Sequence, residues 1–230
     1  MSKTRSTPPG ALREVEIETP VVTESLRKLA LGDVVYLNGL IYTAREGAYR
    51  RILDDGIAPP VALATISNVN FHCSPAAAVT AGGVYRIGAV TATASFRFSR
   101  WMERWFEVSG CRMILGKGGM SPDDYARYFV PREAIYLTTV GYGSGALLGR
   151  GIKQVRDLFW LDELGIAQAI WVLEVERFGP FLVESDLQGN SLFEQQNRAL
   201  NARLEKLYEG LRSPALRRYG ETTSRGDEVI

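Results

Sequence analysis

The feature that most constrains the fold of this chain is a repeated alternation between strand-like and helical segments. Segments rich in β-branched and aromatic residues, which are typical of strands, alternate with segments that have apolar residues at helical spacing and glycine at their ends. Strands are expected near residues 13–20, 33–44, 61–66, 84–90, 111–115, 134–140, 169–178 and 179–186, and helices near 23–32, 45–56 and 98–110, from 121 and from 191. This alternation predicts an α/β protein, for which a doubly wound parallel sheet is the generic arrangement. The short, turn-rich strands in the middle of the chain favour a more mixed sheet.

The two ends of the chain differ in composition from its middle. Residues 1–13 are polar and contain proline and glycine, so we expect a flexible arm there. Residues 213–230 are also polar and are expected to form a disordered tail. No internal repeat and no linker divides the remainder, so residues 14–212 are expected to form a single domain.

The overall composition excludes several classes of protein. The chain has 230 residues, of which 46% are hydrophobic and 23% charged, as in an ordinary globular protein. Its net charge of +1 provides no general attraction for nucleic acid or for a membrane surface. No apolar run approaches the roughly 20 residues of a membrane helix, and the N-terminus lacks an apolar secretory signal. We therefore expect a cytoplasmic protein that binds neither nucleic acid nor membranes.

Cysteine and histidine are too scarce for several kinds of site. The chain has two cysteines, Cys73 and Cys111, and one histidine, His72. Two distant cysteines make neither a disulfide framework nor a zinc site, and an iron–sulfur cluster needs about three or four thiolates. No metal site is therefore expected in this chain, and His72, which follows a strand-like run, is expected to be structural. Any chemistry must use hydroxyl, cationic and carboxylate side chains, or groups from another chain.

The best-marked helix, at residues 98–110, begins beside a group of polar residues. Its apolar face has members at i, i+3, i+4, i+7 and i+8, namely Phe98, Trp101, Met102, Trp105 and Phe106. Gly110 is the expected end of the helix. Thr93, Ser95 and Arg97 lie at its start, where unpaired backbone N–H groups and the helix dipole favour an anion.

A second candidate anion site is the stretch MILGKGGM, residues 113–120. A phosphate-binding P-loop needs G-x-x-x-x-G-K-[ST], and here Gly118 follows Lys117 and no glycine lies five positions before Gly116. The spacing therefore excludes that type of nucleotide site. The glycines on both sides of Lys117 would let a ligand approach the backbone.

Three cations are expected at the ends of strands or helices. Arg45 lies where a strand gives way to a helix, and Arg97 and Lys117 flank the helix at 98–110. Together they would suit a dicarboxylate, with arginine as the bidentate partner and lysine as a point charge. Each residue also has a simpler explanation. Thr93 or Ser95 is then only a helix cap, the two arginines are surface charges, and Lys117 marks a turn.

Several motifs resemble one family, the β subunits or C-terminal domains of class I iron–sulfur hydro-lyases. These enzymes are class I fumarate hydratase and L-tartrate dehydratase. The similar stretches are GDVVYLNGLIYTAREGAYRRI (32–52), FHCSP (71–75), TATASFRF (91–98), MILGKGGM (113–120) and LDELGIAQAIWVLEVERFGPFLVESDLQGNSLFEQ (161–195). The resemblance covers roughly residues 30–210.

The resemblance implies a fold, a partner and a set of site residues. The fold is a swivelling β/β/α domain with mixed sheets and flanking helices. The implied partner is an α subunit that holds a [4Fe–4S] cluster on three cysteines, and dimers of αβ pairs are the family expectation. Thr93 matches a threonine that takes part in proton abstraction. The family's substrate-binding cations fall on Arg45, Arg97 and Lys117. Ser95, Gly116 and Gly118, which lie beside them, complete the expected substrate-binding residues.

The chain also departs from the family pattern close to these residues. The family's arginine–aspartate pair becomes Arg45-Glu46, and its histidine becomes Tyr49. G-P-T-T becomes residues 91–94, Thr-Ala-Thr-Ala, so that a glycine is replaced by the bulkier Thr91. We therefore expect the pocket near Thr93 to differ in shape from that of its relatives.

Two functions remain open at this point. The first is the β subunit of a two-chain hydro-lyase that reversibly hydrates or dehydrates a small hydroxy-dicarboxylic acid, such as fumarate/malate or a tartrate. The alternative is a non-catalytic dicarboxylate-binding or assembly protein with a decayed active site. A threonine hydroxyl is a poor base by itself, so the first function requires an acceptor for its proton on the partner chain.

Overall fold

The computed structural model describes residues 12–141, 144–207 and 209. It divides the chain into two compact units, Met1–Leu192 and Phe193–Ile230. Helix α8 (Leu192–Leu207) is the described element that extends into the second unit, and it begins directly after Ser191, as expected. The single domain over 14–212 stays a prediction. The tail over 213–230 and nearly all of the arm over 1–13 lie outside the described residues.

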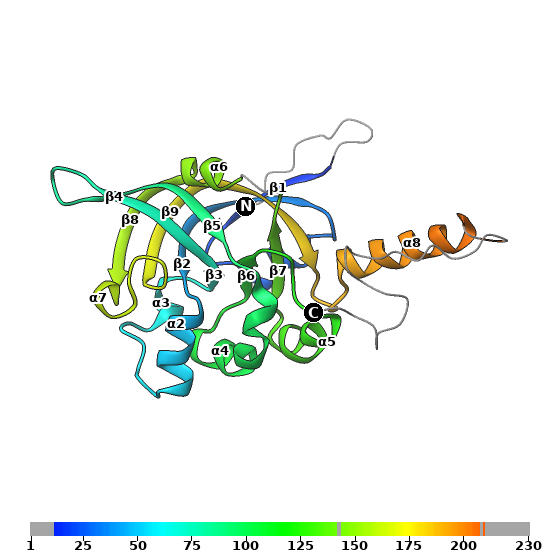
Figure 1. Ribbon diagram of the computed structural model, residues 1–230, viewed down its shortest axis with the longest axis horizontal. Helices are drawn as coiled ribbons and strands as arrows, with labels where there is room; N and C mark the ends of the chain where they lie inside the picture. Colours follow the sequence, from blue (N-terminus) through cyan, green and yellow to red (C-terminus); the bar gives the residue numbers. More distant parts are fainter. Residues whose placement is uncertain (1–11, 142–143, 208, 210–230) are drawn as a thin grey trace, which may run out of the picture. The chain divides into compact units, whose positions relative to one another are not determined.

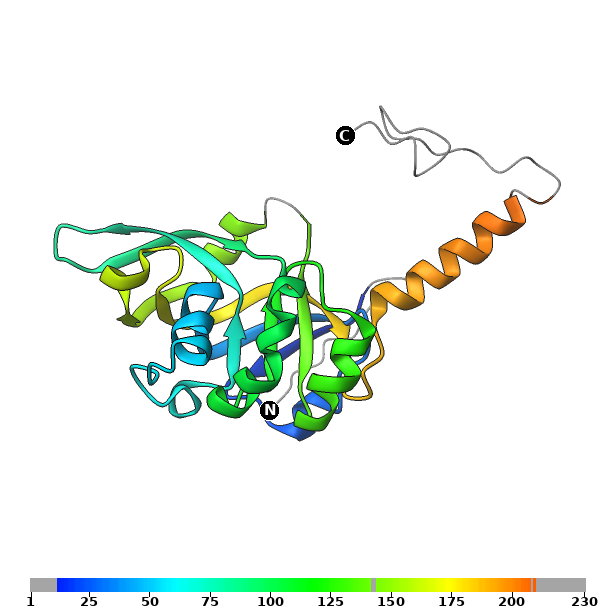
Figure 2. The ribbon, with the colours of Figure 1, turned by 60° about the horizontal axis from the view of Figure 1, so that its bottom comes forward.

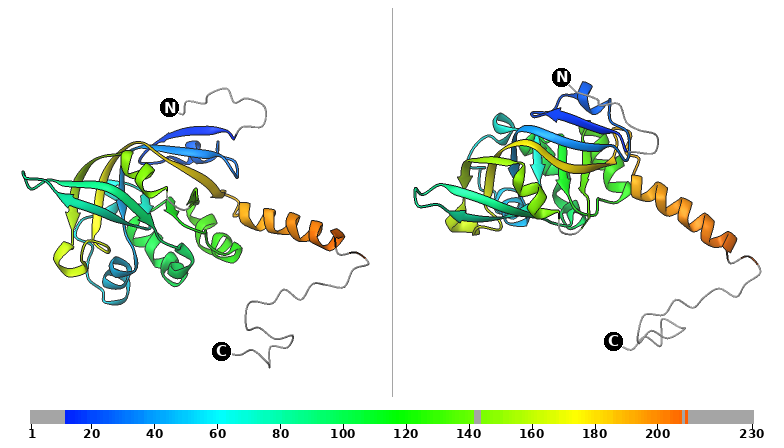
Figure 3. Two further views of the ribbon diagram at one scale, coloured as in Figure 1. Left: turned by 45° about the horizontal axis from the view of Figure 1, so that its top comes forward. Right: turned by 90° about the horizontal axis from the view of Figure 1, so that it is seen from above.

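Seven strands of the first unit form one mixed sheet whose pairings close on themselves. The strands, in spatial order, are β1 (Glu14–Glu18), β2 (Val34–Thr43), β3 (Val69–Phe71), β6 (Met113–Gly116), β7 (Ile135–Thr139), β9 (Ile170–Ser185) and β8 (Ile152–Phe159). β9 also pairs with β2, so β2, β3, β6, β7 and β9 form a closed ring. Figure 3 shows β2 and β9 running side by side, with β1 at the edge.

The directions of the strands rule out a fully parallel, doubly wound sheet. β1, β2, β3, β6 and β7 run parallel to one another, whereas β9 is antiparallel to β2, β7 and β8. A separate hairpin is formed by β4 (Cys73–Val79) and β5 (Tyr85–Ala92), shown in teal in Figure 1. The expected mixed α/β architecture is confirmed.

Two strand predictions need correction. Residues 61–66 contain a short helix, α3 (Leu63–Ile66), instead of the expected strand. A short and mostly apolar run does not by itself distinguish a strand from a buried helical turn. The two strands expected at 169–178 and 179–186 are one strand, β9. It continues through Gly179, where an added Cβ would lie 2.6 Å from the carbonyl oxygen of Val35.

Three helices lie together on one side of this sheet. The remaining helices are α1 (Thr23–Leu26), α2 (Glu46–Tyr49), α4 (Met102–Ser109), α5 (Pro122–Asp124), α6 (Gly145–Arg150) and α7 (Leu161–Leu164). Figures 1 and 2 show α2, α4 and α5 on the same side of the sheet. Successive strand residues face opposite ways, so Leu115 packs in the cluster inside the ring while Ile114 packs in the cluster beneath the helices.

The helix expected at 98–110 is present but begins differently. Ser95–Trp101 is a 3₁₀ helix that continues into α4, so the α-helical N-terminus expected beside Arg97 lies at Met102 instead. The apolar face is buried as predicted, and Gly110 ends the helix with a positive φ of 62°. Ala94 precedes the 3₁₀ segment without a side-chain cap, so neither Thr93 nor Ser95 serves as an N-cap.

Over the part of the chain that the structure describes, every helix is too short or too polar to cross a membrane.

Candidate functional site

Backbone hydrogen bonds bring the segment around Thr93 against Lys117. The amide of Lys117 donates to the carbonyl of Thr93 (3.1 Å), and the amide of Ser95 donates to the carbonyl of Lys117 (3.2 Å). Ala94 and Lys117 thereby form an isolated parallel bridge. The two candidate anion sites predicted from the sequence, around Thr93 and around Lys117, are therefore neighbours. We call this region the corner: residues 93–95 and Lys117, held together by main-chain hydrogen bonds.

The hydroxyls of Thr93 and Ser95 have different surroundings. Ser95 is fully buried, and its Oγ is bonded to His72 Nδ1 (2.7 Å) and accepts from Tyr136 (2.7 Å). Thr93 is 9% exposed, and its hydroxyl has no hydrogen-bond partner among the residues that the structure describes. Within this corner the Thr93 hydroxyl is therefore free to interact with a ligand, whereas that of Ser95 is engaged inside the protein.

The glycines around Lys117 have distinct structural roles. An added Cβ at Gly116 would lie 2.1 Å from Ser95 Oγ and 2.4 Å from the Tyr136 hydroxyl. Gly118 has a φ of +81°, which disfavours other residues, and open space surrounds it. Its amide donates to Thr138 Oγ1 (3.3 Å). Gly116 therefore permits close packing beneath the corner, and Gly118 turns the backbone out of β6.

Gly116→Ala is expected to destabilise the protein by about 1–3 kcal/mol, because the new methyl group must displace two buried hydroxyls. Chemical denaturation of the wild type and the variant would measure this loss. Gly82→Ala is the matched control, since nothing lies within 4 Å of a Cβ at Gly82, and its stability should change by less than about 0.5 kcal/mol. Equal stability of the two variants would contradict the steric conflict expected between a side chain at position 116 and the two hydroxyls.

Arg45 and Arg97 approach the same end of the β4–β5 hairpin. Arg45 Nη1 donates to Ser74 Oγ and to the carbonyl of Ala167 (3.2 Å), and Ser74 pairs with Thr91 in the hairpin. Arg97 forms an ion pair with Glu46, the residue after Arg45, at 3.0 Å. Both side chains of that pair are substantially exposed, so the pair contributes little to stability and can exchange partners.

The guanidinium of Arg45 is poorly satisfied in this structure. Burial lowers its pKa, and the charge of Arg97 acts in the same direction. Its Nε is buried without a hydrogen-bond partner among the described residues. A buried cationic donor that lacks an acceptor is costly, and an anionic ligand would relieve that cost. This orphaned N–H group supports an anion-binding role for Arg45.

A hollow of about 250 Å³ adjoins Lys117. Lys117 and Thr91 line it together with residues of α6, a helix that lies close against β5. Glycines make that approach possible, since a Cβ at Gly145 would lie 2.5 Å from the carbonyl oxygen of Val90. The hollow is smaller than a typical drug-sized site, which is about 300–1,000 Å³, and is suited to a small molecule.

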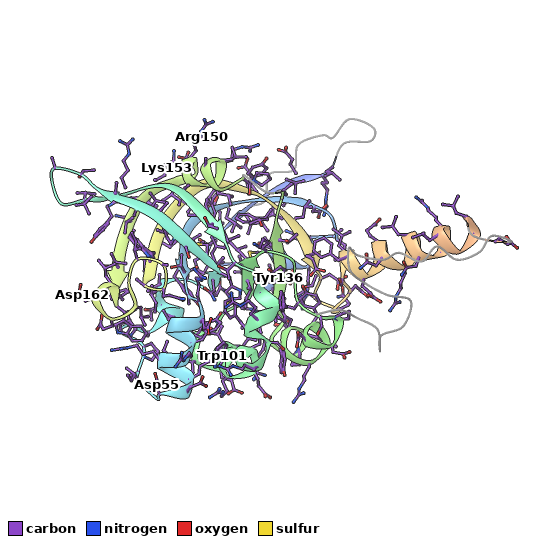
Figure 4. All side chains as sticks on the ribbon, in the orientation of Figure 1. Asp55, Trp101, Tyr136, Arg150, Lys153 and Asp162 are labelled. Atoms are coloured by element: carbon purple, nitrogen blue, oxygen red, sulfur yellow. The ribbon has the colours of Figure 1, made fainter. Side chains whose placement is uncertain are left out.

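A buried polar chain beneath this corner was not predicted from the sequence. His72 is bonded through Nε2 to the Tyr49 hydroxyl (2.6 Å) and through Nδ1 to Ser95, and all three residues are fully buried. Figure 4 labels Tyr136, which lies in the interior and completes the chain at Ser95. These residues are far apart in sequence, so only the fold reveals their contacts. The expectation that His72 is structural agrees with its complete burial.

The two thiols do not suit the cluster that the family resemblance implies. Cys73 and Cys111 are both buried, and burial raises the pKa of each, to about 12 for Cys111, so both stay protonated. A thiolate is the form that binds a metal. Among the described residues, no group of three or more His, Cys, Asp or Glu side chains could hold a metal ion.

The main-chain ladder thus places Thr93 and Lys117 together in one corner of a mixed α/β domain. The chain belongs to the Fumarase C-terminus family, whose model matches residues 2–196.

The chain is similar to several named proteins. It is 32% identical over 191 residues to "Putative L(+)-tartrate dehydratase subunit beta" of Methanocaldococcus jannaschii, covering 80% of this chain and 93% of that protein. It is 27% identical over 195 residues to L(+)-tartrate dehydratase subunit beta of Escherichia coli K12, covering 84% and 93%. It is 29% identical over 197 residues to "Putative fumarate hydratase class I" of Geobacillus stearothermophilus, covering 86% of this chain and 37% of that protein.

Proposed function

We propose that this chain is the β subunit of a two-chain iron–sulfur hydro-lyase that reversibly hydrates or dehydrates a small hydroxy-dicarboxylic acid of the fumarate/malate or tartrate type. The observation that carries the proposal is the corner in which main-chain hydrogen bonds hold Thr93 against Lys117. The hydroxyl of Thr93 has no hydrogen-bond partner there among the described residues. The names of relatives that match most of this chain support the same class of reaction. We further propose a swivelling domain that acts in the cytoplasm, in a dimer of αβ pairs.

Each residue of the corner has a proposed role. Lys117 binds one substrate carboxylate as a point charge, and Arg45 and Arg97 bind the other, for which a planar guanidinium is suited. Thr93 takes part in removing or delivering the proton at carbon, and an acidic group of the partner receives the proton of its hydroxyl. Ser95, Gly116 and Gly118 shape the substrate site around Lys117.

The cofactor belongs to the partner in this proposal. A [4Fe–4S] cluster on the α subunit would supply Lewis-acid chemistry at the substrate hydroxyl and carboxylate. The buried, protonated state of Cys73 and Cys111 is consistent with a cluster held outside this chain. The residues of this chain bind and orient the substrate, and the isolated chain should therefore be inactive.

The alternative is a non-catalytic dicarboxylate-binding or assembly protein. One observation favours it: Thr91, where the family pattern has glycine, lines the hollow beside Lys117. A side chain at this position reduces the space available for a substrate next to the cation. Under this alternative the anion site is retained while turnover is lost.

Anaerobic purification of the tagged chain from its own cells is expected to recover an iron-containing partner. The eluate should hydrate or dehydrate at least one of fumarate, mesaconate and tartrate-type acids. Iron content is measured before and after cluster reconstitution, so that loss of the cluster is not mistaken for lack of activity. A reconstituted, iron-containing complex without turnover would favour the binding protein. Recovery of no iron-containing partner would contradict both the cofactor and the two-chain arrangement.

A further inference from the structure

His72 uses every hydrogen-bonding group it has to join the segments that carry the corner. Its amide donates to the carbonyl of Leu115 (2.8 Å), two residues before Lys117, and its carbonyl accepts from the amide of Thr93 (2.7 Å). Its ring nitrogens contact Ser95 (2.7 Å) and Tyr49 (2.6 Å). One buried residue therefore connects β6, the end of β5 and the start of the 3₁₀ helix.

The neighbours of the ring determine which nitrogen carries the proton. Asn70 Nδ2 donates to the Tyr49 oxygen (2.7 Å), so the proton of the Tyr49 hydroxyl must go to another acceptor. His72 Nε2 is its partner, which requires that this nitrogen accept. A neutral imidazole has one donor and one acceptor, so Nδ1 carries the hydrogen and donates to Ser95 Oγ.

The neutral form of the ring is also supported by its environment. Burial lowers the pKa of His72 to about 3, and the charge of Arg45 adds to the shift. The ring therefore does not act as a second cation beside the anion site at neutral pH. Free imidazole in water favours the opposite tautomer, with hydrogen on Nε2, so the protein selects the less common one.

We infer that His72 is a positioning residue, held as the neutral Nδ1–H tautomer, which fixes Ser95 through its ring and Thr93 through its main chain. It touches no substrate and acts only by holding the turn in which the main chain of Thr93 is bonded to that of Lys117. Its effect on turnover rests on the proposed function, whereas the tautomer and the rigidity of the turn do not.

Nitrogen NMR of the full-length chain tests the tautomer directly. His72 is the only histidine of the sequence, so labelling with ¹⁵N-histidine yields one pair of ring signals that needs no assignment. We expect Nδ1 to be the protonated nitrogen and Nε2 the unprotonated one at pH 7. Tyr49→Phe removes the donor to Nε2 and should release the ring toward the other tautomer. An Nε2–H ring or an imidazolium in the wild type would overturn the inference.

Two amide substitutions separate positioning from general packing. The amide nitrogen of His72→Asn lies near the place of Nδ1 and can donate to Ser95, whereas that of His72→Gln lies near Nε2 and cannot. In the αβ complex, His72→Gln should lower kcat by about 100-fold with KM changed by less than about threefold, because a small misplacement of a reacting group is costly. His72→Asn should restore kcat to within about tenfold of the wild type.

Backbone hydrogen exchange provides a readout that does not depend on activity. The amides of Thr93, Ser95 and Lys117, which form the ladder of the corner, should exchange at least about tenfold faster in His72→Gln than in His72→Asn. Equal kcat and equal exchange in the two variants would overturn the positioning role. If the wild-type complex has no turnover while the tautomer and exchange results hold, the proposed function fails and the positioning role stands.

Discussion

Thr93→Ala is expected to lower kcat of the αβ complex by about 100- to 10,000-fold, the range associated with loss of a group that transfers a proton in the transition state. The main-chain groups of Thr93, which the substitution leaves in place, form the ladder with His72 and Lys117. The side chain makes no hydrogen bond among the described residues. Complex formation and melting temperature should therefore change little, so that the loss is confined to the chemical step.

Two further substitutions make this result specific. Thr93→Ser keeps a hydroxyl and should retain much more activity than Thr93→Ala. Lys117→Ala removes a carboxylate partner and should mainly raise KM, by about 10- to 100-fold. This range corresponds to the loss of a hydrogen bond to a charged group, which contributes about 1.5–3 kcal/mol. Steady-state kinetics of the reconstituted complex measures all three. Full activity of Thr93→Ala would eliminate Thr93 as a catalytic residue, and an unchanged KM for Lys117→Ala would eliminate the proposed carboxylate contact.

The free energy of unfolding should fall as the pH is lowered below about 6.5, through the effect of His72. Its ordinary pKa is 6.5, and burial lowers it to about 3 in the folded chain. Between these values the unfolded chain binds a proton that the folded chain does not, so stability rises with pH across this window and falls on acidification. The largest loss, reached below about pH 3, is on the order of 5 kcal/mol, since one pKa unit is worth about 1.4 kcal/mol.

Urea unfolding between pH 7 and pH 4 measures this effect. His72→Asn cannot take up the proton and serves as the control, because carboxylates and other groups titrate alike in both proteins. The wild type should lose about 2–3 kcal/mol more than the variant between pH 7 and pH 4. Parallel pH profiles for the two proteins would show that the ring is not protected from protonation in the folded state.

Local patterns of the sequence predicted most of the elements. The helix around Trp101 and Trp105 was found because one apolar face repeats at helical spacing, which depends only on neighbouring residues. The start of a helix at residue 121 was also predicted from neighbouring residues, and the structure has Ser121 and Asp124 in a capping box there. Residues 61–66 were assigned wrongly because a short apolar run fits either structure, and packing against the rest of the fold decided in favour of α3.

The candidate site was predictable only in part. The glycines around Lys117 and the position of Thr93 before a helix are signals that neighbouring residues provide. The family resemblance then assigned both residues to one site. The role of Gly116 was not predictable, because the hydroxyls that exclude a side chain there come from Ser95 and from Tyr136 on β7. The buried chain through Tyr49 and His72 was also missed, since each of its hydrogen bonds spans more than 20 residues of sequence.

The sequence by itself determined which residues could act: one histidine, two isolated cysteines, and cations and hydroxyls at the ends of predicted elements. The set of candidate residues depends on composition and on spacing along the chain. Only the tertiary structure decided that Thr93 and Lys117 share one corner and that Ser95 is engaged with His72 while Thr93 is free. The physical reason is that hydrogen bonds between distant segments, formed when β6 lies beside the end of β5, determine which of the two hydroxyls has a partner among the described residues.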